Sequence, residues 1–163
     1  MRRKDREVAL ERALEIIDES MFGVVASQDY ALPLSLAREG NTLYAHSAKS
    51  GEKWEHWAEG TPVTVVFVAW DRVPHPHSKE ELLDLPNNRL PKVFTTNFAS
   101  AMVRGKIRIL DEVEERRRAL YAICKKYMND DEMELFDRAF NLSDRVTAVY
   151  AIDMESVTGK VKE

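Results

Sequence analysis

Apolar and polar positions repeat with two different periods along the chain, which predicts a mixture of helices and strands. Between residues 7 and 17 apolar side chains recur every three or four positions among charged ones, as they do on an amphipathic helix. Residues 21–27, 31–38 and the run that begins at Leu43 alternate instead, and they are separated by turn-forming residues. These three short strands predict an antiparallel meander.

The middle of the chain contains a strand that is apolar along nearly its whole length. Val63 to Trp70 has the composition of a strand buried on both faces. Residues 71–91 hold most of the prolines and a short helical stretch that Ser78 would cap, which is typical of a lid, a dimer element or a mobile loop. Residues 93–110 follow as one bent strand or a strand pair, with a bend or bulge at Gly105.

The last third predicts two helices and a closing strand. Asp111 is the expected N-cap of a long amphipathic helix, and residues 130–140 form a second, short helix. Residues 145–154 alternate as a final strand, and residues 157–161 end the chain. The whole pattern predicts an α+β domain whose six or seven mostly antiparallel strands close into a β-barrel with flanking helices.

Composition narrows the class of protein. The 163 residues suit one domain, 1–163, and the formal net charge of −4 comes from 28 acidic and 24 basic residues interleaved along the chain, so we expect no nucleic-acid partner. The charged N-terminus and the lack of a long apolar run predict neither a signal peptide nor a membrane span. With a single cysteine, Cys124, the chain forms no internal disulfide. We therefore expect a cytoplasmic protein.

Candidate chemistry concentrates where the strand that begins at Leu43 passes through small residues into a helix ending near Trp57. A helix start there would present free backbone N–H groups and a positive dipole end. Ser47 and Ser50 add hydroxyl donors, and Lys53 adds a positive charge on the first turn. The stretch is suited to hold a phosphate group. An ordinary strand-to-helix loop with Ser50 as N-cap remains the alternative interpretation.

Other candidate residues each allow two interpretations. His46 could act as a general acid or be packed as a structural histidine. Lys160 could reach an anionic ligand or lie in a solvated tail. The pair of imidazoles in residues 75–77 has no third ligand in sequence, so we predict a solvated loop there and no metal site. Three tryptophans could stack on a flat ligand or serve as core or interface anchors: Trp54, Trp57 and Trp70.

Several short motifs also carry a resemblance to a known family. They are the opening residues 1–7, Leu32–Ser35, His46–Ala48 followed by Gly51 and Lys53, and Phe98–Ala101 followed by Gly105. In this order the set resembles nitroimidazole-resistance-type flavoproteins, a subgroup of the pyridoxamine 5'-phosphate oxidase-like split-barrel proteins that bind FMN. The resemblance runs from Arg2 to the Thr158–Lys160 end. The family commonly has Tyr and Val where this chain has Phe98 and Ala101.

The resemblance implies a six-stranded split barrel that forms a homodimer and binds FMN between the two subunits. It further implies an FMN-dependent oxidoreductase that moves electrons from a reduced nicotinamide or another donor to a small acceptor, for example a nitroaromatic compound. The alternatives are a non-catalytic flavin-binding protein, a related split barrel that binds haem or a deazaflavin, and a structural dimer without flavin.

The resemblance also assigns individual residues to the flavin site. Two are implied as phosphate ligands: Ser47 and Lys53. Two are implied as contacts near the ribityl chain and ring: His46 and Ala48. His46 is also the candidate catalytic residue. Three lie on the strand that is implied to run beside the isoalloxazine ring: Pro33, Leu34 and Ser35. Ser100 is implied to approach the flavin from a neighbouring strand or from the other subunit.

Overall fold

The computed structural model describes residues 4–72 and 78–163. Its strands are β1 (Glu7–Val8), β2 (Gly23–Ala26), β3 (Ala31–Leu34), β4 (Ala37–Glu39), β5 (Thr42–Ala48), β6 (Pro62–Arg72), β7 (Asn97–Ile109) and β8 (Thr147–Lys162). Its helices are the 3₁₀ turn η1 (Lys4–Arg6), α1 (Leu10–Glu19), α2 (Lys53–His56), α3 (Lys79–Asp84), α4 (Leu90–Val93), α5 (Val113–Tyr127), α6 (Asp130–Met133) and α7 (Phe136–Ser143). Among these residues, no helix combines the length and apolar character needed to cross a bilayer.

All the strands belong to one curled antiparallel sheet. Its order is β3-β2-β6-β7-β8-β5-β4, with β1 paired to β8. The two edge strands, β3 and β4, are consecutive in the chain and are separated only by Ser35 and the buried Leu36. The sheet must therefore curl until its edges meet, which leaves a split between them. The predicted α+β split-barrel class is confirmed; the sheet has eight strands because the predicted strand 31–38 divides into β3 and β4 and because β1 adds a short one.

The barrel interior holds the main hydrophobic core, and α1 packs against it. Ile16 and Ile17 of α1 are fully buried with Phe67 and Ile152 from the sheet. Gly159 permits this close approach, because a Cβ at this position would lie 2.8 Å from the Ala13 Cβ. The helix predicted from residue 7 therefore begins at Leu10, since Glu7 and Val8 pair with β8 as β1.

A second core lies on the outer side of the sheet beneath α5. Tyr44 of β5 and Val149 of β8 are buried there against Ala119 and Ile123 of α5. The predicted cap of this helix is wrong: the N-cap is Glu112, and no side chain caps it. Ser78, in contrast, accepts a hydrogen bond from the Glu81 N–H and completes a capping box at α3, as predicted.

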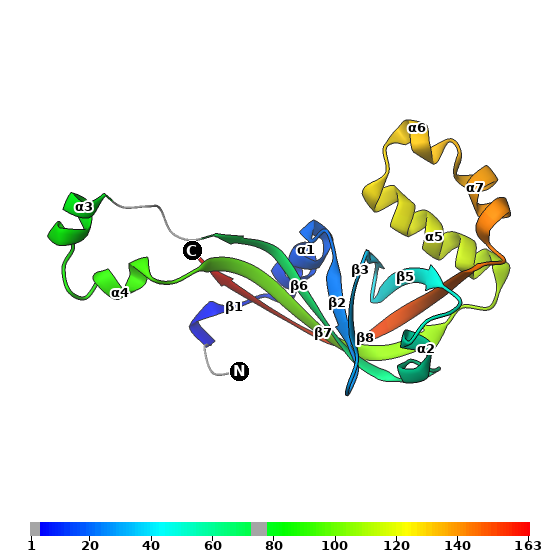
Figure 1. Ribbon diagram of the computed structural model, residues 1–163, viewed down its shortest axis with the longest axis horizontal. Coiled ribbons are helices and arrows are strands. Elements are labelled where there is room, and N and C mark those ends of the chain that lie inside the picture. Colours follow the sequence, from blue (N-terminus) through cyan, green and yellow to red (C-terminus); the bar gives the residue numbers. More distant parts are fainter. Residues whose placement is uncertain (1–3, 73–77) are drawn as a thin grey trace.

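Strands β6, β7 and β8 extend beyond the barrel as a long arm, and α3 and α4 lie past its far end (Figure 1). Strand β8 is longer than the predicted strand 145–154. It continues to Lys162 and pairs with β7 and β1 along the way, so residues 157–161 are part of the sheet and do not form a tail. On the outer face of the arm Val68 and Met102 are exposed.

Candidate functional site

The turn between β5 and α2 differs from the predicted helix start. Gly51 has a φ of 115°, and a Cβ there would lie 3.5 Å from the Lys53 Nζ. Ser50 does not cap the helix; Glu52 is the N-cap and makes no capping hydrogen bond. Because α2 is only one turn long, it supplies no useful dipole, and the prediction of a dipole site here is wrong. The positive charge at this turn comes from Lys53 itself.

Lys53 is a buried cation without an acidic partner. Only 7% of the residue is exposed. Its Nζ donates a hydrogen bond of 2.9 Å to the Ser50 carbonyl oxygen and lies 5.3 Å from the centre of the Trp54 ring. No carboxylate in residues 4–72 or 78–163 forms an ion pair with it. A buried charge is costly unless an opposite charge compensates it, so this lysine is suited to hold an anionic ligand.

Aromatic side chains pack beside this turn. Trp54 and Trp57 meet the Tyr150 ring edge-on, with centroid separations of 5.7 Å and 5.9 Å. The Trp57 Nε1 and the Tyr150 hydroxyl are buried without a hydrogen-bond partner among the described residues. Ser47 lies close enough to influence the Tyr150 hydroxyl, whose pKa burial raises, although no well-aligned hydrogen bond joins them. Two buried donors without a described acceptor are unusual in a native protein.

A pocket of about 380 Å³ opens next to the two tryptophans. Lys49, Ile109 and Val149 also line it. Lys53 does not line this pocket, whose cations are Lys49 and Arg116. Arg116 is held by Asp144 through two hydrogen bonds of 2.8 Å and 2.7 Å, and this pairing keeps the pKa of the Asp144 carboxyl below its usual value. Lys53 therefore differs from Arg116 in having its charge available for a ligand.

Strand β3 lies at the same end of the barrel. Tyr30, just before β3, stacks on His56 of α2 with ring centres 4.9 Å apart, and the His56 Nδ1 is 3.1 Å from a carboxylate oxygen of Asp29. Along the following strand residues Pro33 and Ser35 are exposed, whereas Leu34 is half-buried. The stack places the start of β3 beside α2, and the roles implied for Pro33, Leu34 and Ser35 stay predictions.

His46 lies on the outer face of β5 beside Ser47 and Ala48. Its side chain is exposed in the single chain, yet partial desolvation by the surrounding protein lowers its pKa below the ordinary histidine value. The imidazole is therefore neutral at pH 7 and able to accept a proton.

We expect His46 to titrate below about pH 6.5, the value of an unperturbed histidine. Because the unfolded chain then binds the proton more tightly than the folded one, stability from this residue is present above pH 6.5 and is lost on acidification. Following the histidine ring signals by NMR against pH, with His46→Gln to identify the resonance, measures the midpoint. A midpoint above that of free histidine would contradict the desolvated environment.

Ser100 is not brought to this cluster within one chain. It pairs with Lys160 near one end of β8, whereas Ala48 pairs with Thr147 at the other end. The two positions are roughly 40 Å apart along the strand at about 3.3 Å per residue. Ser100 instead lines a separate groove on the arm, and only a second copy of the chain could place it beside Lys53.

Some residues of the cluster could not be found by sequence reasoning alone. Trp57 and Trp54 left two interpretations open, and the structure places both at the site, while Trp70 lies on the arm beneath Arg72. Tyr150 was missed, because in sequence it is one apolar position of an alternating strand. Residues 1–3 and 75–77 lie outside the described residues. Within the described ones, no group of His, Cys, Asp or Glu side chains is arranged to hold a metal ion.

Comparison with known proteins places this architecture in context. The family model described as pyridoxamine 5'-phosphate oxidase matches residues 10–161. No curated protein gives a significant match. One similar solved structure is a candidate 5-nitroimidazole antibiotic resistance protein from Bacteroides thetaiotaomicron, with 22% identity and a TM-score of 0.66 over 95% of this chain and 86% of that one.

Two further similar structures have names that include cofactors. The FAD and haem binding protein from Mycobacterium smegmatis shares 19% identity, with a TM-score of 0.68 over 97% of this chain and 74% of that one. An FAD-binding protein from Mesorhizobium loti shares 17% identity, with a TM-score of 0.58 over 97% and 98% of the two chains. Likeness at these identities establishes a common fold and leaves activity to be argued from the site.

Proposed function

Because the chain belongs to the pyridoxamine 5'-phosphate oxidase family, we propose that it is a homodimeric FMN-dependent oxidoreductase that transfers electrons from a soluble donor to a small acceptor. The observation that carries the proposal is Lys53, a buried cation whose only described polar partner is a backbone carbonyl. An FMN phosphate carries about −1.5 to −2 charge, as other phosphate monoesters do, and would supply the missing counter-charge.

The residues around Lys53 fit the rest of such a ligand. Ser47 adds a hydroxyl at the turn before Lys53. Pro33 and Leu34 on β3 offer an apolar edge against which a flat ring can lie. When bound, FMN would supply the electron chemistry, and the protein would bind, orient and shield it.

His46 is the proposed proton-handling residue. Its lowered pKa leaves the imidazole neutral at pH 7, so it first accepts a proton and acts as an acid only after that. This order refines the role of general acid that its position in the sequence suggests.

The proposed dimer follows from the separation of Ser100 and Lys53 along β8. If Ser100 approaches the flavin, it does so from the second subunit, since its own Lys53 is too far away. The long arm presents Val68 and Met102 as exposed apolar side chains on a face that a second copy could cover.

The absorption spectrum of the purified protein, followed by identification of the molecule that heat releases, tests the proposal. We expect flavin bands and FMN in the released fraction, and turnover with a reduced nicotinamide donor and a nitroaromatic acceptor. A colourless protein that takes up no added FMN would overturn the cofactor and the reaction together. A haem spectrum or released FAD would replace the cofactor, and bound FMN without turnover would indicate a non-catalytic flavin protein.

A further inference from the structure

Residues 78–96, which we call the α3–α4 segment, carry apolar side chains that their own chain leaves uncovered. Helices α3 and α4 have six and four residues, and neither contains a buried residue. Leu83 is 76% exposed and Phe94 is 80% exposed. Helices this short are marginal in water unless a tertiary contact stabilises them, so we expect another surface to cover these side chains.

The segment lies far from the barrel of its own chain. It joins the end of β6 to the start of β7, and the Lys162 Nζ donates a hydrogen bond of 3.0 Å to the Thr96 carbonyl oxygen at its base. Lys162 ends β8, whereas the turn that carries Lys53 lies beside the start of this strand. The 16 residues of β8 separate the two places, which is about 50 Å of strand. A second molecule is therefore needed to cover the segment.

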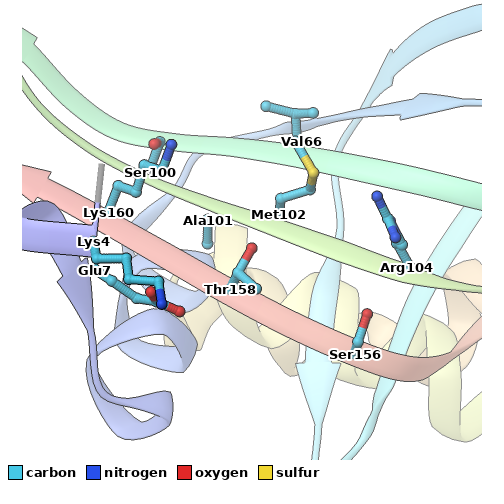
Figure 2. A pocket seen from close by; sticks show the side chains of 10 residues that line it. All are labelled: Lys4, Glu7, Val66, Ser100, Ala101, Met102, Arg104, Ser156, Thr158 and Lys160. Carbon is cyan, nitrogen blue, oxygen red and sulfur yellow. The ribbon is translucent and has the colours of Figure 1, made fainter. Parts of the chain in front are cut away.

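The neighbouring face of the arm belongs to the proposed dimer. Figure 2 shows Val66, Ser100 and Met102 around a groove of about 690 Å³ on this face, which Arg104 and Lys160 also line. Ser100 is the fourth residue of β7, so it lies about 10 Å from the point where the α3–α4 segment ends. A second subunit whose flavin meets Ser100 therefore has this segment beside its barrel as well.

The barrel carries an exposed apolar patch that such a segment can cover. Met21 and Phe22, both exposed, stand just before β2 and form what we call the Met21–Phe22 patch. The next residue, Gly23, pairs with Leu34, so the patch lies at the end of β3 where the ring-side residues are implied. The Tyr127 hydroxyl donates a hydrogen bond of 2.9 Å to the Met21 carbonyl oxygen. The patch is thus held on α5 as a fixed part of the barrel.

The spacing along the two surfaces is compatible with this contact. Tyr30 stacks on α2, the helix that begins at Lys53, and the chain runs about 17 Å from Tyr30 along β3 to Ser35 beside the patch. On the arm, the α3–α4 segment lies about 10 Å beyond Ser100. If Ser100 lies along the flavin of the other subunit, the segment reaches the patch at the far end of β3.

We propose that the α3–α4 segment of one subunit packs through Leu83 and Phe94 on the Met21–Phe22 patch of the other and forms the outer wall of its flavin site. The inference rests on the proposed dimer and gives it a second contribution from the opposite subunit besides Ser100. By two-fold symmetry the contact occurs twice. Because the two apolar side chains occupy space beside the ring, the wall restricts how large an acceptor can approach the flavin.

Photocrosslinking of the full chain tests the contact independently of any flavin. Benzoylphenylalanine replaces Phe94 in one sample and Leu142 of α7 in the other. Leu142 is the matched control, because it is 79% exposed and has no place in the proposed contact. We expect the label at position 94 to give a dimer-sized product on a denaturing gel, with residues 21–35 of the other chain attached. The label at position 142 should not attach to these residues.

Substitution of Phe94 tests what the contact does. We expect Phe94→Ser to accelerate amide hydrogen exchange in α3 and α4 by about tenfold or more, since burial of one large apolar side chain shifts an equilibrium by at least this factor. Iodide should then quench the fluorescence of bound flavin more strongly, and a bulky nitroaromatic acceptor should gain in kcat/KM relative to a small one. Leu142→Ser should change none of these quantities, and thermal unfolding checks that both variants are folded.

Three results would overturn the inference. No product between chains at position 94 means that a second copy does not cover the segment. A product attached to another part of the second chain, such as its own α3–α4 segment, places the contact away from the flavin site. A chain that is monomeric during labelling has no such contact at all. Failure of the proposed function is distinct: a dimer that crosslinks at residues 21–35 and binds no FMN keeps the contact, whereas an FMN-loaded dimer without this crosslink loses it.

Discussion

Replacing Lys53 with Met is expected to weaken FMN binding by about 30-fold or more, whereas Lys49→Met should change it by less than about twofold. Truncating one side of a buried, hydrogen-bonded charge pair typically costs about 2–5 kcal/mol, and each 1.4 kcal/mol is tenfold in affinity. Lys53 is 7% exposed, while Lys49 is an exposed lysine four residues away on the same turn. The two substitutions remove the same charge from the chain and differ in its burial.

The apoprotein should respond in the opposite sense. Without a ligand, the Lys53 ammonium is buried with one carbonyl and one aromatic ring as its described contacts. Because Met fills a similar volume without a charge to desolvate, Lys53→Met should leave the free energy of unfolding of the apoprotein unchanged or raise it by about 1 kcal/mol. A residue that costs stability and is needed for ligand binding is one placed for function.

Fluorescence titration of FMN into each apoprotein, together with urea unfolding of the same samples, measures both quantities. The phosphate assignment fails if Lys53→Met and Lys49→Met retain FMN equally well. Loss of FMN accompanied by an equal loss of apoprotein stability would instead indicate that Lys53 serves the fold.

Substituting Gly105 with Ala is expected to destabilise the protein by about 3 kcal/mol, which lowers Tm by roughly 6–12 °C in a chain of this size. A Cβ at this position would lie 2.3 Å from the carbonyl oxygen of Asp153, in the backbone of β8. The register between β7 and β8 shifts between Arg104 and Gly105, because β8 carries an extra residue, Glu155, between the partners of these two. The predicted irregularity is therefore present, but the bulged residue lies on β8 opposite Gly105. Relief of the contact would require the two longest strands to separate.

Gly60→Ala provides the control for this substitution. Gly60 has a φ of 80°, so it carries a backbone strain penalty of about 1 kcal/mol when replaced, but no atom lies within 4 Å of an added Cβ. Urea unfolding of both variants compares the two costs. Equal destabilisation would contradict the view that close strand approach, rather than loss of glycine flexibility, fixes the residue at 105.

Local periodicity and apolar runs predicted most elements because each carries its own pattern of apolar residues. The α5 helix and strand β6 follow directly from the spacing of apolar residues. The prediction that β6 is buried on both faces is wrong: Val63, Val65 and Phe67 are buried on one face, whereas Val68 on the other is exposed. Strand β8 was predicted too short, since Gly159 and its neighbours lack an alternating apolar pattern. That glycine is required by a residue remote in sequence, Ala13 of α1, and such a contact leaves no local signal.

The candidate site was predicted only in part, because some of its properties depend on contacts between residues remote in sequence. The turn from Ser47 to Lys53 is contiguous in sequence, and the structure retains it as a unit. That Lys53 is buried and lacks a carboxylate partner depends on how the barrel closes around it, which the spacing of residues does not contain. Arg104 and Lys160 are 56 positions apart in the numbering and become neighbours in one groove only through the β7–β8 register.

The position of β8 in the sheet has a consequence for how the molecule folds. It follows in sequence every strand that it pairs with, and it lies between β7 and β5 in the strand order. Until β8 is synthesised, no strand connects the β3-β2-β6-β7 half of the sheet to the β5-β4 half. Strand β1 likewise has no partner until then, because β8 follows it by more than a hundred residues. Such late, long-range pairing gives a high contact order, so barrel closure should be slow and should follow synthesis of the C-terminal strand, with unpaired strands exposed to aggregation until then.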